Sequence, residues 1–177
     1  MTPLGHAGYS LLLGTTLLHI SPNSDPSQLL STIVAGGGTP DLDLFYSMYK
    51  KGSKVLDKNA GEHRFYFTHT PFFLLGISLI FCLVNLTAGI YFAIGAMIHL
   101  LLDTLFFPEG INFAFPFDEK RIRFFTINLG QNFWAKKPIA QVPNWKINYL
   151  RAPLFWIFEV IPTLLALALV IPIVYKS

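Results

Sequence analysis

Charged side chains are scarce in this sequence. Asp, Glu, Lys and Arg make up 13% of the 177 residues, against about a quarter in ordinary soluble domains. Hydrophobic residues make up 53%, the mean hydropathy is +0.50, and 17 Phe and three Trp add aromatic bulk. This shortage of charge argues against an ordinary soluble domain and predicts a single membrane-embedded domain over residues 1–177.

Cysteine is almost absent as well. Cys82 is the single thiol, so an internal disulfide is excluded, and its apolar surroundings favour a small core residue. The N-terminal stretch lacks a basic n-region and a small-x-small cleavage site. We therefore expect a mature helix there and not a cleaved signal peptide. The sequence shows neither internal repeats nor low-complexity segments.

Apolar runs separated by turn residues predict an all-α, polytopic membrane bundle of about four to five apolar helices. The first helix is expected from about His6 to Ile20, followed by a turn at Ser21–Pro26. The second begins near Ser27 and ends at the triple glycine Gly36–Gly38. Each reaches roughly 15–23 Å, less than the ~30 Å hydrocarbon core, so both are expected to be tilted, half-buried or packed inside the bundle.

Three further apolar helices are predicted over residues 72–86 behind Pro71, over Ile90–Phe107, and over Pro153–Tyr175. Asn85–Gly89 is expected to form the turn between the first two, and Pro108 with Gly110 to end the second. The third is the best candidate for a transmembrane helix, and its internal Pro162 predicts a kink, as does Pro172. A short amphipathic helix is also expected over Leu42–Tyr49.

The basic residues are concentrated in two polar segments. Thr39–Thr70 holds five and Pro108–Ala152 holds seven of the 13 Lys and Arg, which leaves Lys176 elsewhere. If the two helices between these segments form a hairpin, both segments emerge on one side, and the positive-inside rule makes that side cytoplasmic. The net charge of +3 and the pI near 9.0 then report topology and contact with anionic headgroups, and nucleic-acid binding is disfavoured.

These segments divide the predicted domain into three parts. Residues 1–116 form a motif-bearing core, residues 117–152 a basic and aromatic interfacial segment, and residues 153–175 the C-terminal transmembrane helix. The aromatic tail Phe124–Trp156 favours an interfacial belt in the lipid bilayer, with a protein-docking surface as the alternative.

The polar residues of the apolar helices form a possible metal site. His99 and Asp103 are four residues apart and share one helix face, which supplies half of a divalent-metal site. Alternating helix directions bring seven candidate ligands to one end of the bundle, with His19 at the other end: His6, Asp41, Asp43, His63, His69, His99 and Asp103. Ionisable groups are costly in apolar helices, and helical bundles build metal sites from such groups.

Each of these residues also has a structural explanation. Asp41 and Asp43 could form a turn and a helix cap, and His69 could cap a helix at the membrane interface. His63 and Arg64 could lie on the surface, and His6 could be a polar residue at the N-terminus. His99 and Asp103 could form a structural hydrogen-bonded pair inside the bundle. The coincidence of all of them at one end favours the metal site.

Several short motifs in the sequence resemble those of a known protein family. They are Gly5–His6, Pro40–Asp43, His63–Arg64, Thr68–His69, and HLLLD…PEGI…P from His99 to Pro116. In this order, over about the first 116 residues, the chain resembles the LexA-binding, inner-membrane-associated, metal-dependent hydrolase family. Leu44 stands where that family often has His, and Phe65 where it has Gly. The resemblance implies a small polytopic protein of a bacterial or archaeal inner membrane.

The donor types predict metal-assisted hydrolysis. Mixed His and Asp ligation suits one or two zinc ions, with manganese or iron as alternatives. A metal-activated water is the expected nucleophile, Asp41 or Asp43 the general base, and Arg64 the group that holds a phosphate. The expected substrate is a phosphoester or lipid-linked molecule at the cytoplasmic face. The rival classes are a metal-ion or proton transporter, and a non-catalytic partner-binding membrane protein with a structural metal.

Overall fold

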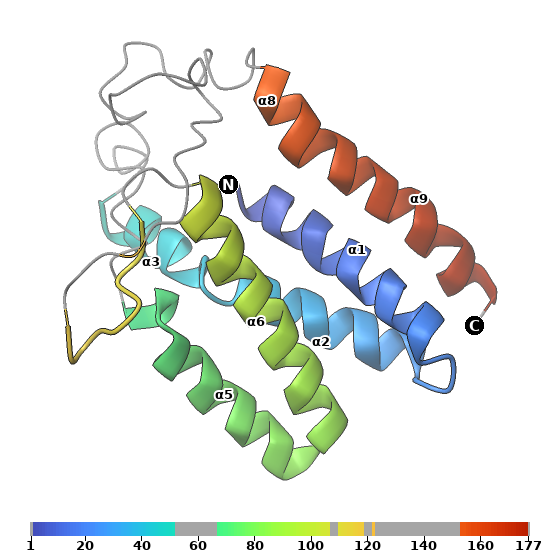
Figure 1. Cartoon of the computed structure of the whole chain (residues 1–177), viewed down its shortest axis with the longest axis horizontal. Coiled ribbons are helices and arrows are strands. Elements are labelled where there is room, and N and C mark those ends of the chain that lie inside the picture. The colour runs from blue at the N-terminus through green and yellow to red at the C-terminus, as the bar shows by residue number, and fades with distance from the viewer. Residues whose placement is uncertain (1, 52–66, 107–109, 119–121, 123–152, 177) are drawn as a thin grey trace.

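The protein is helical almost throughout the part described by a computed structural model (Figure 1), which covers residues 2–51, 67–106, 110–118, 122 and 153–176. Within these ranges no strand occurs, and an isolated bridge pairs Ile111 with Ile122. The prediction of an all-α protein is therefore confirmed for the described residues.

Within the described ranges, six helices and one 3-10 turn follow in order. They are α1 (Pro3–Ile20), α2 (Pro26–Gly38), α3 (Leu42–Lys51), the 3-10 turn η3 (Phe67–His69), α5 (Pro71–Val84), α6 (Leu86–Phe106), and a last helix that runs through α8 (Pro153–Phe155), the π-helical turn η5 (Trp156–Val160) and α9 (Ile161–Lys176). Proline opens four of these elements because its fixed backbone angle suits a first helical position and its missing N–H is not needed there.

Helix caps move two of the predicted boundaries. The Thr2 hydroxyl accepts the Gly5 N–H, so α1 begins at Pro3 and not near His6. The turn before α6 takes only Asn85, whose side chain accepts the Ala88 N–H at 3.0 Å. As a result α6 begins at Leu86, four residues before the predicted Ile90.

Pro162 is preceded by a widened helical turn. The Ile161 N–H bonds to the carbonyl of Trp156, which closes a π-helical turn. A proline ring crowds the carbonyl four residues earlier, here that of Phe158, and a widened turn relieves that crowding. A π-helical turn therefore precedes Pro162, and Pro172 lies inside α9, whereas the kinks predicted at these two prolines stay predictions.

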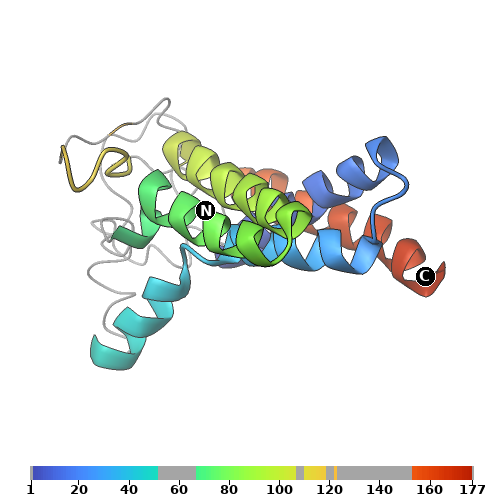
Figure 2. The same ribbon diagram turned by 90° about the horizontal axis from the view of Figure 1, so that it is seen from below.

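The long helices pack as a bundle with α6 in contact with α2 and α5, and with α1 in contact with α2 and α9 (Figures 1 and 2). Apolar side chains fill these seams, with Leu74, Phe92 and Leu100 between α5 and α6 and Leu29 and Ile33 between α1 and α2. The start of α1, the end of α2, the start of α5 and the end of α6 gather at one end of the bundle (Figure 1).

Two helices are long and apolar enough to cross a membrane. They are Leu86–Phe106 and the continuous helix Pro153–Tyr175, whereas the apolar α5 has only 14 residues. Large apolar side chains lie exposed on α5 and α9, as expected of surfaces that face lipid. The predicted apolar helices are present, but only these two of the described helices meet the requirements of a span. A bundle of four to five spans is not established.

Candidate metal centre

His99 and Asp103 form the first contact of the centre. Both lie on α6 and are fully buried, with 3.5 Å between His99 Nε2 and Asp103 Oδ2. His99 Nδ1 lies 2.7 Å from the carbonyl oxygen of Gly37. A carbonyl only accepts, so Nδ1 carries the proton and Nε2 presents its lone pair to the carboxylate. This orientation by an outer acceptor is typical of metal-binding histidines.

The contact with Gly37 depends on how closely α2 approaches α6. A Cβ atom at Gly95 would lie 2.0 Å from the carbonyl oxygen of Ile33, and one at Gly36 would lie 2.1 Å from that of Phe92. Only glycine lets the two backbones meet at this distance. The carbonyl of Gly37 belongs to the last turn of α2, where carbonyls lack a helical partner and can accept a side chain.

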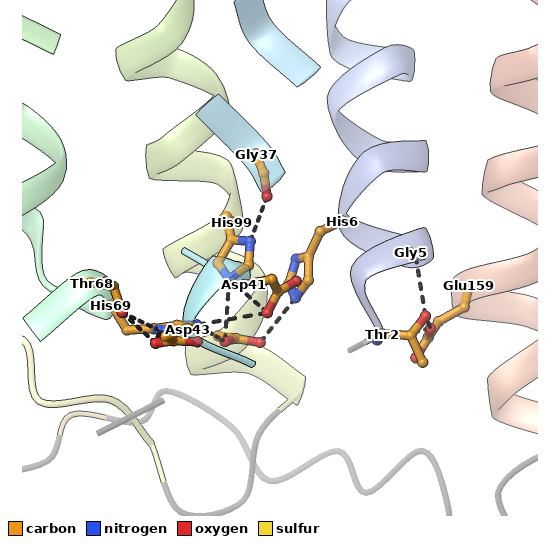
Figure 3. Close-up of polar contacts among 11 residues, drawn as sticks. Thr2, Gly5, His6, Gly37, Asp41, Asp43, Thr68, His69, His99 and Glu159 are labelled. Atoms are coloured by element: carbon orange, nitrogen blue, oxygen red, sulfur yellow. Dashed lines mark hydrogen bonds and ion pairs between the residues drawn. The ribbon is translucent and has the colours of Figure 1, made fainter. Parts of the chain in front are cut away.

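The imidazole of His69, which lies on η3, is also oriented by an acceptor at its Nδ1. His69 closes η3, is fully buried, and its Nδ1 lies 3.0 Å from Asp43 Oδ2. The Thr68 hydroxyl donates to the same oxygen. With Nδ1–H directed at Asp43 (Figure 3), His69 Nε2 faces Asp41 Oδ1 and Asp103 Oδ2, each at a distance of 3.8 Å.

Four donor atoms therefore share one small space: Nε2 of His69 and His99, Oδ1 of Asp41 and Oδ2 of Asp103. The four contacts between imidazoles and carboxylates measure 3.5, 3.8, 3.8 and 4.0 Å. Ligands of a tetrahedral zinc with bonds of about 2.0–2.1 Å lie roughly 3.3 Å apart. The residues therefore fit a divalent metal after a small contraction of the cluster.

His6 enters the cluster from α1. Its Nε2 lies 3.2 Å from Asp103 Oδ1, the oxygen not used by His99, and its ring stacks on that of His99 with centroids 3.7 Å apart. The ring is fully buried, and its Nδ1 makes no hydrogen bond with the described residues. Buried polar atoms normally have a partner, so the cluster has a place for a further polar group or ion.

The charge of the cluster is dominated by carboxylates. Asp41, Asp43 and Asp103 are at most 7% exposed, and burial of such groups is costly without compensation. Burial lowers the pKa of His69, but its hydrogen bonds to the carboxylates of Asp41 and Asp43 and the charge of Asp103 raise it, and the net shift of its pKa is upward. The upward shift favours the protonated form of His69, whose positive charge offsets part of the negative charge of the carboxylates.

Six of the seven predicted ligand residues meet in this cluster: His6, Asp41, Asp43, His69, His99 and Asp103. Asp43 lies behind His69 and not in the shared donor space. His69 does not cap α5, because the Thr70 hydroxyl does so. His19 lies at the opposite end of α1, as predicted. His63 and Arg64 fall outside the described residues.

Two residues of the cluster were not assigned a role from the sequence. Gly37 supplies the acceptor for His99, and Thr68 supplies a hydroxyl to Asp43. The triple glycine indicates a close helix contact, but a backbone acceptor has no signature in sequence. The sequence shows that Thr68 places a hydroxyl beside His69, but it does not show that this hydroxyl bonds to Asp43, 25 residues earlier.

The fold and the cluster together define a helical membrane protein with a buried His and Asp centre at one end. Comparison with known families agrees with the membrane part of this description. The family model described as YdjM inner membrane protein matches residues 1–175, so the chain belongs to that family. Neither the curated proteins nor the solved structures contain a match. The family supports inner-membrane association; LexA binding and metal-dependent hydrolysis stay predictions.

Proposed function

We propose that the chain is a membrane-bound, metal-dependent hydrolase. The observation that carries this proposal is the convergence of four side chains from three separate segments into one buried donor space: His69 from η3, His99 and Asp103 from α6, and Asp41 from the turn before α3. A stabilising ion pair would need only two such groups. Two imidazoles held by outer acceptors, with their lone pairs facing two carboxylates, instead match the ligand set of a divalent metal.

The described donors favour a single ion. Two groups have suitable spacing, namely His6, Asp41 and His99, and His69, His99 and Asp103. Both groups use His99, which has one nitrogen left because the other donates to Gly37. One lone pair serves one ion, so we propose one zinc with five candidate ligand residues, or one manganese or iron in its place.

A bound divalent ion would lower the pKa of a water and polarise a phosphoryl oxygen. Side chains of this chain would bind the ion, and neighbouring groups would orient those ligand side chains. Asp43 fixes the tautomer of His69, so it is proposed as a positioning residue in place of the predicted general base. Asp41 is proposed as a ligand, because its Oδ1 faces both imidazoles. The phosphate contact predicted for Arg64 stays part of the proposal.

The proposed substrate is a lipid-linked phosphoester reached from the cytoplasmic face. The position of the cluster at one end of the bundle supports this, since a transporter would need its ligands near the middle of the membrane. The membership in an inner membrane family supports a substrate that resides in the same membrane.

The test is hydrolysis of phospholipids and lipid phosphates by purified, zinc-loaded protein, measured as release of the headgroup from the phospholipids and of phosphate from the lipid phosphates, with His99→Ala as the inactive reference. Metal-dependent release by the wild type alone would support the proposal. A protein that binds stoichiometric zinc and releases nothing from the whole panel would overturn the hydrolase proposal and leave a structural metal.

A further inference from the structure

The helix that follows the metal centre has an unusual exposed face. Leu42, Phe45, Tyr46 and Tyr49 of α3 are 59, 59, 55 and 90% exposed. Their spacing of three, four and seven residues from Leu42 places them in one stripe along the helix. Large apolar side chains gathered in this way on a water-soluble surface usually mark a binding face.

The same helix has little support from the bundle. It leaves the other helices at the end that carries the metal centre (Figure 2), and none of the extensively packed pairs of described elements includes it. With ten residues, α3 is shorter than the roughly 12–15 residues at which isolated helices become even marginally stable in water. Contact of its apolar stripe with another surface would stabilise it.

We propose that α3 lies in the interface of the membrane, with this stripe inserted among the lipid headgroups and the first acyl carbons. The chain belongs to an inner membrane family and exposes further apolar surface on α5 and α9, so lipid already surrounds the molecule. Tyrosine is favoured at that depth because its ring is apolar and its hydroxyl stays in the polar layer.

This placement sets the depth of the metal centre. Asp41 directly precedes α3 and Asp43 belongs to its first turn. A helix held at headgroup depth therefore holds these two carboxylates at the level where the phosphates of lipids reside. The inference about α3 stands on its exposed stripe and does not depend on hydrolysis.

The test is a site-directed spin-label scan of Leu42–Lys51, one cysteine at a time, in a Cys82→Ser background and in vesicles of phosphatidylethanolamine and phosphatidylglycerol. Collision rates with oxygen, which enters the membrane, and with a polar nickel chelate, which stays in water, report the depth of each label. We expect the ratio of oxygen to nickel collisions to oscillate with a helical period and to peak at positions 42, 45, 46 and 49.

Two results would overturn the inference. Nickel collisions that are highest at those four positions would place the stripe in water. Spin–spin broadening at Tyr49→Cys that disappears on dilution with unlabelled protein would show that a second copy of the chain covers the stripe. Because the scan needs no metal or substrate, either result can be distinguished from a failure of the hydrolase proposal.

Discussion

His99 and Asp103 are the residues whose replacement should affect metal binding most directly. Replacement of either by Ala removes one of the four donors, so purified protein should lose most of its bound metal in elemental analysis. His19→Ala is the matched control, because this histidine lies on the opposite end of α1 and bonds only to the Thr15 carbonyl in the described part of the chain. Wild-type metal content in either cluster variant would contradict the proposed ligand set.

Asp43 should behave differently from a ligand. In Asp43→Asn the amide oxygen still accepts the His69 proton, but the negative charge behind the imidazole is lost. Metal affinity should fall by about 10–100-fold while saturating metal still reaches the wild-type content. Asp25→Asn, at the exposed cap of α2, should leave the affinity unchanged. A lower metal content at saturation would instead show that Asp43 binds the ion itself.

The pKa of His69 predicts a pH dependence of metal binding. It is raised above the unshifted value of 6.5, so below the raised pKa a metal ion must displace a proton from this imidazole. Affinity measured by chelator competition should keep rising with pH above 6.5 and level off above the raised pKa. In metal-free protein the sign is opposite, because this histidine contributes stability below 6.5 that is lost as pH rises through its pKa. An affinity that is already constant at 6.5 would contradict the shift.

At the scale of elements, the crossing of α2 and α6 controls the centre. In Gly95→Ala the new methyl group would lie 2.0 Å from the backbone carbonyl of Ile33, so the helices must separate. Unfolding free energy should fall by about 1–3 kcal/mol, and metal affinity should fall with it because the contact between Gly37 and His99 is stretched.

The matched control for this crossing is Gly76→Ala on α5. A methyl group there meets nothing within 4 Å, so this variant should be neutral or slightly more stable, by up to ~1 kcal/mol, since alanine favours a helix. Denaturant unfolding in detergent compares the two variants. Equal stability of both would show that the close approach of the helices is not required.

Sequence predicted these elements more easily than their contacts. Apolar runs, prolines and capping residues located α1, α2, α5, α6 and the last helix, because those signals act within a few residues of each boundary. The two largest boundary errors, at Pro3 and Leu86, arose where one side chain caps a helix earlier than the apolar pattern begins.

At the scale of the whole molecule, the orientation in the membrane can be tested. The centre is predicted to be cytoplasmic, so the α1–α2 turn at the other end should face the periplasm. In a Cys82→Ser background, Asn23→Cys should react in intact cells with a membrane-impermeant thiol reagent. Phe117→Cys, at an exposed position whose ring contacts Phe72 at the start of α5, should react only after the cells are opened. The reverse pattern would invert the proposed topology.

The sequence by itself determined that the chain is helical and membrane-associated, and that His99 and Asp103 share one face. Such conclusions follow from composition and from spacings within a single helix, where geometry is fixed by 3.6 residues per turn. Alternating helix directions predict that the seven candidate ligands lie at one end of the bundle. They do not predict that the side chains of these residues contact one another.

Tertiary structure alone decided which atoms meet. His6 and Asp103 are 97 positions apart in sequence, and their 3.2 Å contact depends on how α1 and α6 pack. The position of Gly37 behind His99 likewise depends on the crossing of α2 and α6, where glycines let the backbones meet. The position of Asp43 behind His69 depends on the contact between α3 and η3. Local patterns carry no information on those crossing distances, and therefore the sequence could predict the donors but not their arrangement.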